Sequence, residues 1–263
     1  MKSYQLNYKN AAIVYYSNRN TQKETLLFLH PAFSSSQGFN DQFQHFSDNY
    51  NLLAIDMPGH GATKTKGHKV TFRDIDDIID LILKKEGIKK VHIIGVSLGS
   101  LVAQYFAEKY PVYISSVTIV GGYSIHKEYK KIIKAQRKEQ MKWIPSMIFP
   151  NKERFAKKIV ADTVCTETGK EKFLKTMSPL GMSTFMSMDG ANSLFIDKAE
   201  MISYPLLALY GDHESEIALY AAELLKQLEP GAIVQYVEGA GHCIHLDQPN
   251  IFNETIQTFI MKH

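Results

Sequence analysis

The chain has 263 residues, 44% hydrophobic and 22% charged, which suits one α/β domain with an insertion or two small domains. A net charge of +3, with no aromatic residues interleaved in a basic stripe, argues against nucleic acid as a partner. The two cysteines make neither a disulfide framework nor a zinc-ligand spacing, and the N-terminus lacks an apolar leader, so we expect a cytoplasmic protein.

The first half of the chain alternates apolar strand-like runs with helical patterns. The best delimited helix begins at Thr71, which forms a capping-box pattern with Asp74, and ends at Gly87. Further helices are expected at 38–46 and from 98 to Pro111. The patterns favour strands at residues 3–8, 11–17, 25–29, 51–55, 91–94 and 115–120.

The alternation stops between about 122 and 203, where the pattern favours several helices rich in lysine and methionine. It then resumes, with strands at 205–210 and 232–238 and helices at 216–228 and 249–261. Strands alternating with helices predict a mainly parallel, eight-stranded sheet with helices on both faces. We therefore expect a core formed by residues 1–122 and 204–263, interrupted by an inserted helical unit at 123–203.

The most informative local pattern is Gly95-Val96-Ser97-Leu98-Gly99. It lies between a buried strand and a helix, which is the context required of a nucleophile elbow. A sharp turn there would lift the oxygen of Ser97 clear of the sheet, at a helix N-terminus that favours negative charge. Taken alone, the window also fits a glycine-rich turn with a bystander serine.

Three more stretches occur in the order expected of one family: His30-Pro31-Ala32 after a strand, Asp56-x-x-Gly-His-Gly after the next, and Gly239-Ala240-Gly241-His242 near the end. With the elbow, they make the chain resemble the α/β-hydrolase fold superfamily, in its small soluble branch of capped esterase-like enzymes. The resemblance covers nearly the whole chain. It implies that residues 123–203 are a helical cap over the active site.

The resemblance implies a catalytic triad in the order serine, acid, histidine. Ser97 would be the nucleophile and His242 the base. The family's usual spacing after the preceding strand selects Glu214 as the acid, and Asp212, two places earlier, is the alternative. His245, three residues beyond the base, is interpreted as a lining or capping residue.

Serine hydrolysis also needs two N–H donors for the oxyanion. The resemblance assigns them to the backbone of Leu98 and of Ala32. Pro31 stands where the family usually has glycine, which restricts the loop but leaves the amide of Ala32 in place. His30 is expected to be structural. The histidines lack metal-ligand spacing, so no metal and no cofactor are expected.

Substrate contacts are expected from Phe33 and from two residues of the predicted cap, Trp143 and Phe185. Methionines around 177–188 fit core packing and a plastic apolar pocket wall equally well; as a pocket wall they would suit an acyl chain. The cap is also basic between 127 and 158, which fits either a solvated helix face or weak contact with a membrane surface or amphiphile. The chain could be a monomer or a homodimer.

These features predict hydrolysis of a carboxylic ester with a small to medium apolar acyl group, on a small-molecule substrate. The same residues would also serve a thioesterase, a lysophospholipase, an amidase or a carbon–carbon bond hydrolase. A hydrolase-like ligand-binding or signalling protein with slow turnover is the alternative from another class.

Overall fold

The computed structural model describes residues 1–20, 22–65, 69–125, 134, 152–178, 182–197 and 201–263. Its sheet has eight strands in the order β1-β2-β4-β3-β5-β6-β7-β8. β1 and β2 are antiparallel to each other, β2 is antiparallel to β4, and all other neighbours are parallel. The strands are β1 (Lys2–Tyr8), β2 (Ala11–Ser17), β3 (Thr25–Leu29), β4 (Asn51–Ile55), β5 (Val91–Val96), β6 (Ile114–Val120), β7 (Leu206–Gly211) and β8 (Ile233–Val237).

The central strands form because their sequences are continuous apolar runs. Every residue of β3, β4, β5 and β7 is buried, as expected of strands covered on both faces. The α-helices that the structure describes are α1 (Asn40–Phe46), α2 (Ile75–Glu86), α3 (Leu98–Lys109), α6 (Lys152–Thr163), α7 (Glu167–Thr176), α8 (Met182–Ser187), α9 (Glu216–Leu228), α10 (Ile244–Asp247) and α11 (Pro249–Ile260).

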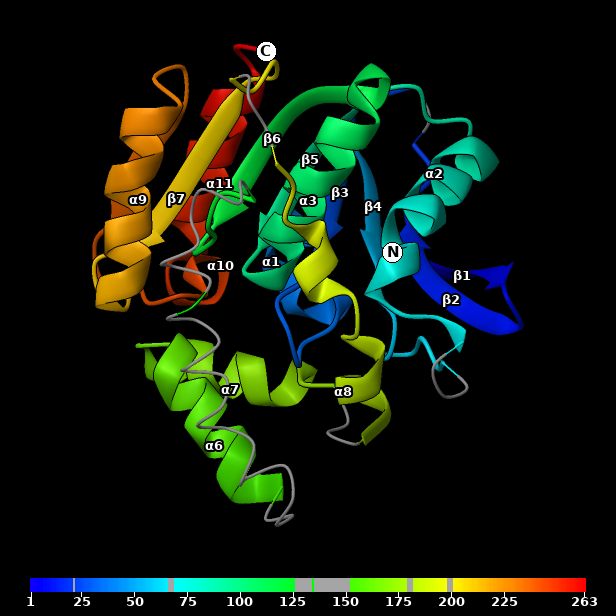
Figure 1. The fold of residues 1–263 in the computed structure, drawn as a ribbon, viewed down its shortest axis with the longest axis horizontal. Helices are drawn as coiled ribbons and strands as arrows, with labels where there is room; N and C mark the ends of the chain where they lie inside the picture. Colours follow the sequence, from blue (N-terminus) through cyan, green and yellow to red (C-terminus); the bar gives the residue numbers. More distant parts are fainter. Residues whose placement is uncertain (21, 66–68, 126–133, 135–151, 179–181, 198–200) are drawn as a thin grey trace.

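The helices cover both faces of the sheet (Figure 1). Apolar side chains of α2, α3 and α9 pack into the core on one face, and those of α1 and α11 pack into the core on the other. The predicted architecture, a mainly parallel eight-stranded sheet flanked by helices on both faces, is confirmed.

The capping box predicted from the sequence is present, although a short 3₁₀ turn, Phe72–Asp74, precedes α2. The Asp74 carboxylate accepts a hydrogen bond from the Thr71 amide at 2.9 Å, and the Arg73 amide donates to Thr71 Oγ1 at 3.3 Å. Gly87 ends α2 in the left-handed conformation at φ 67°. The helix predicted at 38–46 likewise begins as a 3₁₀ turn, Ser36–Phe39, before α1.

The segment between β6 and β7, where the sequence predicts an insertion at 123–203, contributes α6, α7 and α8; it is called the insertion below. These helices lie together beyond one end of the sheet (Figure 1). Trp143 and most of the predicted basic stretch lie outside the described residues. Among the described residues, no helix is both long and apolar enough to cross a bilayer.

Candidate active site

Ser97 occupies a strained turn between β5 and α3. Its backbone lies at φ 53° and ψ −113°, and its amide donates a 2.8 Å hydrogen bond to the carbonyl of Val120 at the end of β6. A Cβ at Gly95 would lie 2.2 Å from the carbonyl oxygen of Gly99. One at Gly99 would lie 2.1 Å from the carbonyl oxygen that ends β3. Both glycines are therefore required by close backbone contacts, which explains the spacing of the motif.

His242 and Glu214 form a hydrogen-bonded pair. His242 Nδ1 lies 2.8 Å from Glu214 Oε1, and the two side chains are 18% and 3% exposed. Burial by itself would lower the pKa of His242, but the charge and hydrogen bond of Glu214 outweigh it and raise that pKa above its usual value. The pair is thus arranged as a base whose second nitrogen is held and oriented by a carboxylate.

Asp212 has a different partner. Its carboxylate accepts a 3.1 Å hydrogen bond from the amide of Ala240 and is exposed to solvent. Backbone hydrogen bonds, that of Gly239 first, lower the pKa of Asp212. Of the two acids considered from the sequence, the structure therefore pairs Glu214 with His242, while Asp212 holds the backbone of the loop before His242.

Gly121 links this pair to the turn at Ser97. It follows Val120, whose carbonyl holds the Ser97 amide, and it has φ +56°. A Cβ at Gly121 would lie 2.6 Å from His242 Nδ1 and 2.7 Å from Glu214 Oε1. The absence of a side chain at this position is therefore what lets the His242–Glu214 pair lie against the end of β6.

The loop after β3 forms a tight turn from Pro31 to Ser34. The Ser34 amide donates a 3.3 Å hydrogen bond to the Pro31 carbonyl, and Phe33 takes a left-handed conformation at φ 63°. Ala32 lies within this turn. On the other side, Leu98 begins α3, whose first amides have no intrahelical acceptor. Both amides assigned to the oxyanion from the sequence thus lie on backbone turns next to buried strand ends.

Two buried polar residues, His30 and Asp56, hold the loop after β3 in place through hydrogen bonds. His30 Nε2 accepts from the Met57 amide at 3.0 Å, and its Nδ1 lies 2.8 Å from the Pro31 carbonyl oxygen, which makes it a neutral Nδ1–H tautomer. Burial lowers the pKa of His30 to about 4. Asp56 accepts from the amides of Ser36 and Ala62, each at 2.8 Å, and so ties the loops after β3 and β4 together.

The insertion contacts the same loop through Ser178. The Ser178 amide donates to the Phe33 carbonyl at 2.8 Å, and its hydroxyl donates to the carbonyl of Ser34. The same hydroxyl accepts from the Gly61 amide at 2.8 Å. The ring of Phe33 packs edge-on against Phe155 of α6, with ring centroids 5.7 Å apart. Ser178 therefore joins the insertion, the loop after β3 and the loop after β4.

Two other sequence expectations concern side chains near the site. Phe185 belongs to α8, but its side chain lies outside the described part of the structure. The interpretation of His245 as a lining or capping residue is wrong. Its ring is buried between those of Phe39 and Phe252, with centroids 4.9 and 5.9 Å away, because α10 turns it into the core.

Sequence reasoning did not single out Gly121, Ser178 or Asp247. The contacts of each include residues far away in the chain, so no local pattern marks it. Across the described ranges, no group of three or more His, Cys, Asp or Glu side chains is placed to hold a metal ion. These neighbouring strand ends carry a serine hydroxyl, an imidazole hydrogen-bonded to a carboxylate, and backbone amides, which are the kinds of group that nucleophilic acyl transfer uses.

Comparison with known proteins agrees with the fold. The family described as alpha/beta hydrolase fold matches residues 24–249. The chain belongs to this family.

Its similarity to individual proteins is more distant. It is 24% identical to a putative 2-succinyl-6-hydroxy-2,4-cyclohexadiene-1-carboxylate synthase of Bacillus subtilis, over 90% of each chain. It is 22% identical to the dihydrolipoyllysine-residue acetyltransferase component of an acetoin cleaving system of Cupriavidus necator, over 93% of this chain but only 65% of that protein. A carboxylesterase structure from Nitrososphaera gargenis superposes with a TM-score of 0.81 over 99% of both chains, at 15% identity.

Proposed function

We propose that the protein is a serine hydrolase that cleaves carboxylic esters with a small to medium apolar acyl group. The observation that carries the proposal is the 2.8 Å pair of Glu214 and His242 beside Gly121. Gly121 directly follows the residue whose carbonyl holds the backbone of Ser97. The end of β6 therefore lies against both the strained turn of Ser97 and the imidazole of His242, which Glu214 orients.

In the proposed mechanism, Ser97 Oγ attacks the ester carbonyl carbon while His242 Nε2 takes its proton. Glu214 stabilises the resulting imidazolium through its hydrogen bond to His242 Nδ1. His242 then gives the proton to the departing alkoxide as the carbon–oxygen bond breaks. Water, deprotonated by His242, then attacks the acyl carbon. His242 returns that proton to Ser97 Oγ as the acyl carbon–Oγ bond breaks, which releases the carboxylic acid and restores the enzyme.

The tetrahedral intermediates carry a negative oxygen, which the proposal assigns to the amides of Leu98 and Ala32. Two features support it: Leu98 begins a helix, and Ala32 lies in a turn whose shape is fixed by Phe33 and Ser178. Donors held in place before the reaction need no reorganisation when the charge develops. The helix dipole of α3 adds to the stabilisation near Ser97.

The proposal also treats the insertion as a cap that selects the substrate, with Phe33, Trp143 and Phe185 as lining residues. The contacts of Ser178 and Phe155 with the loop after β3 support a place for the insertion over this end of the sheet. A cap at this position would limit the entry of bulk water during turnover, apart from the one water molecule that attacks the acyl-enzyme.

A second candidate uses the same residues on a different bond. The Bacillus subtilis relative, covered over 90% of each chain, carries the name of a synthase that forms a cyclohexadiene carboxylate. In such a reaction His242 would act as a base on carbon. Formation of that product by this protein, with no ester turnover, would favour the second candidate.

Hydrolysis of p-nitrophenyl esters from acetate to palmitate, by wild type and Ser97→Ala, tests the main proposal. We expect turnover that peaks at a short or medium chain and is lost in the variant, with unchanged circular dichroism. A burst without turnover would indicate a slow ligand-binding relative of the hydrolases. Undiminished hydrolysis by Ser97→Ala would overturn the proposal.

A further inference from the structure

Asp247 lies at the end of α10, five residues after His242, and is 7% exposed. One carboxylate oxygen, Oδ2, accepts a 2.9 Å hydrogen bond from the amide of Gly241, the residue directly before His242. The same oxygen accepts a 3.2 Å hydrogen bond from the amide of Cys165 in the insertion. A single oxygen therefore joins the backbone beside His242 to the insertion.

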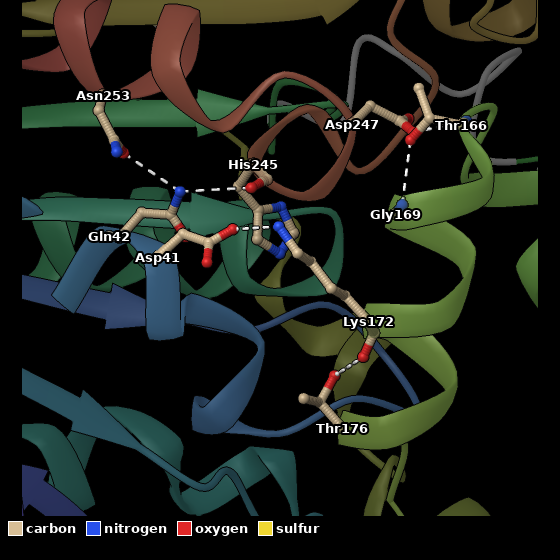
Figure 2. Close-up of polar contacts among 9 residues, drawn as sticks. All are labelled: Asp41, Gln42, Thr166, Gly169, Lys172, Thr176, His245, Asp247 and Asn253. Atoms are coloured by element: carbon tan, nitrogen blue, oxygen red, sulfur yellow. Dashed lines mark hydrogen bonds and ion pairs between the residues drawn. The ribbon is translucent and has the colours of Figure 1, made fainter. Parts of the chain in front are cut away.

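The other oxygen of Asp247 binds the start of α7. Oδ1 accepts from the amide of Thr166 at 2.8 Å and from its hydroxyl at 2.7 Å. The Thr166 hydroxyl in turn accepts from the Gly169 amide at 3.1 Å and caps α7 (Figure 2). Asp247 thus has four donors, three of them in the insertion, and each would lose its acceptor if the carboxylate were removed.

The residue after His242 is also held by the insertion. The Cys243 amide donates a 2.9 Å hydrogen bond to the carbonyl of Thr163, the last residue of α6. A Cβ on Gly241 would lie only 3.2 Å from that same carbonyl oxygen. Both neighbours of His242 are therefore fixed against the turn between α6 and α7.

We propose that Asp247 is a positioning residue that fixes the loop of His242 to the insertion, so that the base is correctly oriented only while this part of the insertion is docked. The inference rests on the proposed function, in which His242 is the base. A base must be held close to its productive geometry, because a displacement of about 1 Å lowers rates by about 100-fold. The amides of Gly241 and Cys243, on either side of His242, are bonded to Asp247 and to Thr163, and these two bonds fix the backbone that carries the imidazole.

The structure also offers a matched control on the same helix. Lys172 of α7 forms a 2.6 Å ion pair with Asp41 of α1, and the two side chains are 34% and 33% exposed (Figure 2). This contact also ties α7 to the core, but it is not bonded to the loop of His242. Asp41→Asn therefore removes one contact between α7 and α1 and leaves every hydrogen bond of Asp247 in place.

The experiment measures the pKa of the His242 imidazole by NMR in wild type, Asp247→Asn and Asp41→Asn, with the signal assigned from a His242→Gln variant. Each carboxylate oxygen of Asp247 accepts from two donors. In Asp247→Asn an NH2 group replaces one of these oxygens, so the two donors bonded to that oxygen would face another donor and lose their acceptor. We expect the loop to loosen, the contact with Glu214 to weaken, and the pKa of His242 to fall. Glu214 is the charged group that raises this pKa. The other titratable groups next to His242 in the chain are Cys243, and His245 and Asp247 of α10.

In parallel, kcat for the best ester should fall about 10- to 100-fold in Asp247→Asn, with the acid limb of kcat/KM moving to lower pH. Asp41→Asn should match wild type in both respects. An Asp247→Asn protein that is less stable but keeps the wild-type pKa of His242 and the wild-type pH profile would show a purely structural role and overturn the inference.

Asp247→Glu is the second variant, for use where Asp247→Asn does not fold. It keeps the charge but displaces both oxygens by one methylene, and the same fall in the pKa of His242 is expected; an unchanged pKa would equally overturn the inference. The NMR measurement needs no substrate. Absence of Ser97-dependent turnover in wild type would therefore refute the proposed function, while the imidazole titration would still decide whether Asp247 positions His242.

Discussion

Glu214 Oε1 lies 2.8 Å from His242 Nδ1, while the neighbouring Asp212 carboxylate is bonded to the amide of Ala240. Burial lowers the pKa of His242, and the nearby charge of Glu214 reverses that effect. The pH dependence of the reaction should therefore depend on Glu214 and not on Asp212.

Replacing Glu214 by Gln removes the charge and keeps the size of the side chain. Burial then dominates, so the pKa of His242 should fall and the acid limb of kcat/KM should move to lower pH. The maximal rate should drop by roughly 100- to 10,000-fold, since the imidazolium loses its counter-charge. Asp212→Asn is the matched control: it removes the charge but keeps an oxygen that can accept from the Ala240 amide, so it should stay close to wild type. The reverse ranking would assign the acid to Asp212.

Gly121→Ala should separate His242 from Glu214. The new Cβ would lie 2.6 Å from His242 Nδ1, and alanine is strained at φ +56° by about 1–2 kcal/mol. We expect kcat/KM to fall on the order of 100-fold. Gly87→Ala is the control, because Gly87 has φ +67° but nothing within 4 Å of an added Cβ. It should lose similar stability and no activity, and equal activity losses in both variants would argue against a role for the contact.

The central strands and α2 could be predicted from sequence because their signals are local. A strand buried on both faces is a continuous apolar run, and α2 carries its own capping box and terminal glycine. The elbow is equally local. By contrast, the bond between Thr166 and Asp247 spans 81 positions and that between Ser178 and Ser34 spans 144, so neither residue stands out in the sequence. The spacing after β7 could favour Glu214 over Asp212 as the acid. Their actual partners, His242 and the Ala240 amide, lie on the loop after β8, which meets the loop after β7 only in the folded protein.

Ser178→Ala should loosen the loop after β3, which carries the amide of Ala32 that the proposal assigns to the oxyanion. It removes the acceptor of the Gly61 amide and the donor to the Ser34 carbonyl, at about 1–3 kcal/mol of unfolding free energy. We expect kcat to fall by roughly threefold to tenfold with KM nearly unchanged, since the loop acts on the charged intermediate. Affinity for a boronic acid that mimics this intermediate should fall in parallel.

Ser35→Ala is the control for Ser178. The Ser35 hydroxyl donates a 2.8 Å hydrogen bond to the Thr176 carbonyl and so also ties this loop to the insertion, with one contact fewer. It should have a smaller effect on kcat and on boronic acid binding. A rise in KM alone in Ser178→Ala would contradict a role in stabilising the intermediate.

His245→Leu should make the protein more resistant to acid. Burial lowers the pKa of His245 from 6.5 to about 3, so below pH 6.5 the unfolded chain takes up a proton that the folded chain does not. This lowers stability progressively as the pH falls towards 3, by about 2 kcal/mol at pH 5. The variant should remove that loss, so urea unfolding should show a smaller decrease in stability between pH 7 and pH 5 than in wild type. An equal decrease in both proteins would contradict the lowered pKa.

The proposed chemistry requires a covalent acyl group on one particular oxygen. The most direct test is rapid acid quench of the protein during turnover of its best p-nitrophenyl ester, followed by intact-mass and peptide-mapping mass spectrometry. The proposal predicts a mass increase equal to one acyl group, located on Ser97 and absent in Ser97→Ala. Turnover without any adduct on Ser97, or an adduct on another residue, would contradict it.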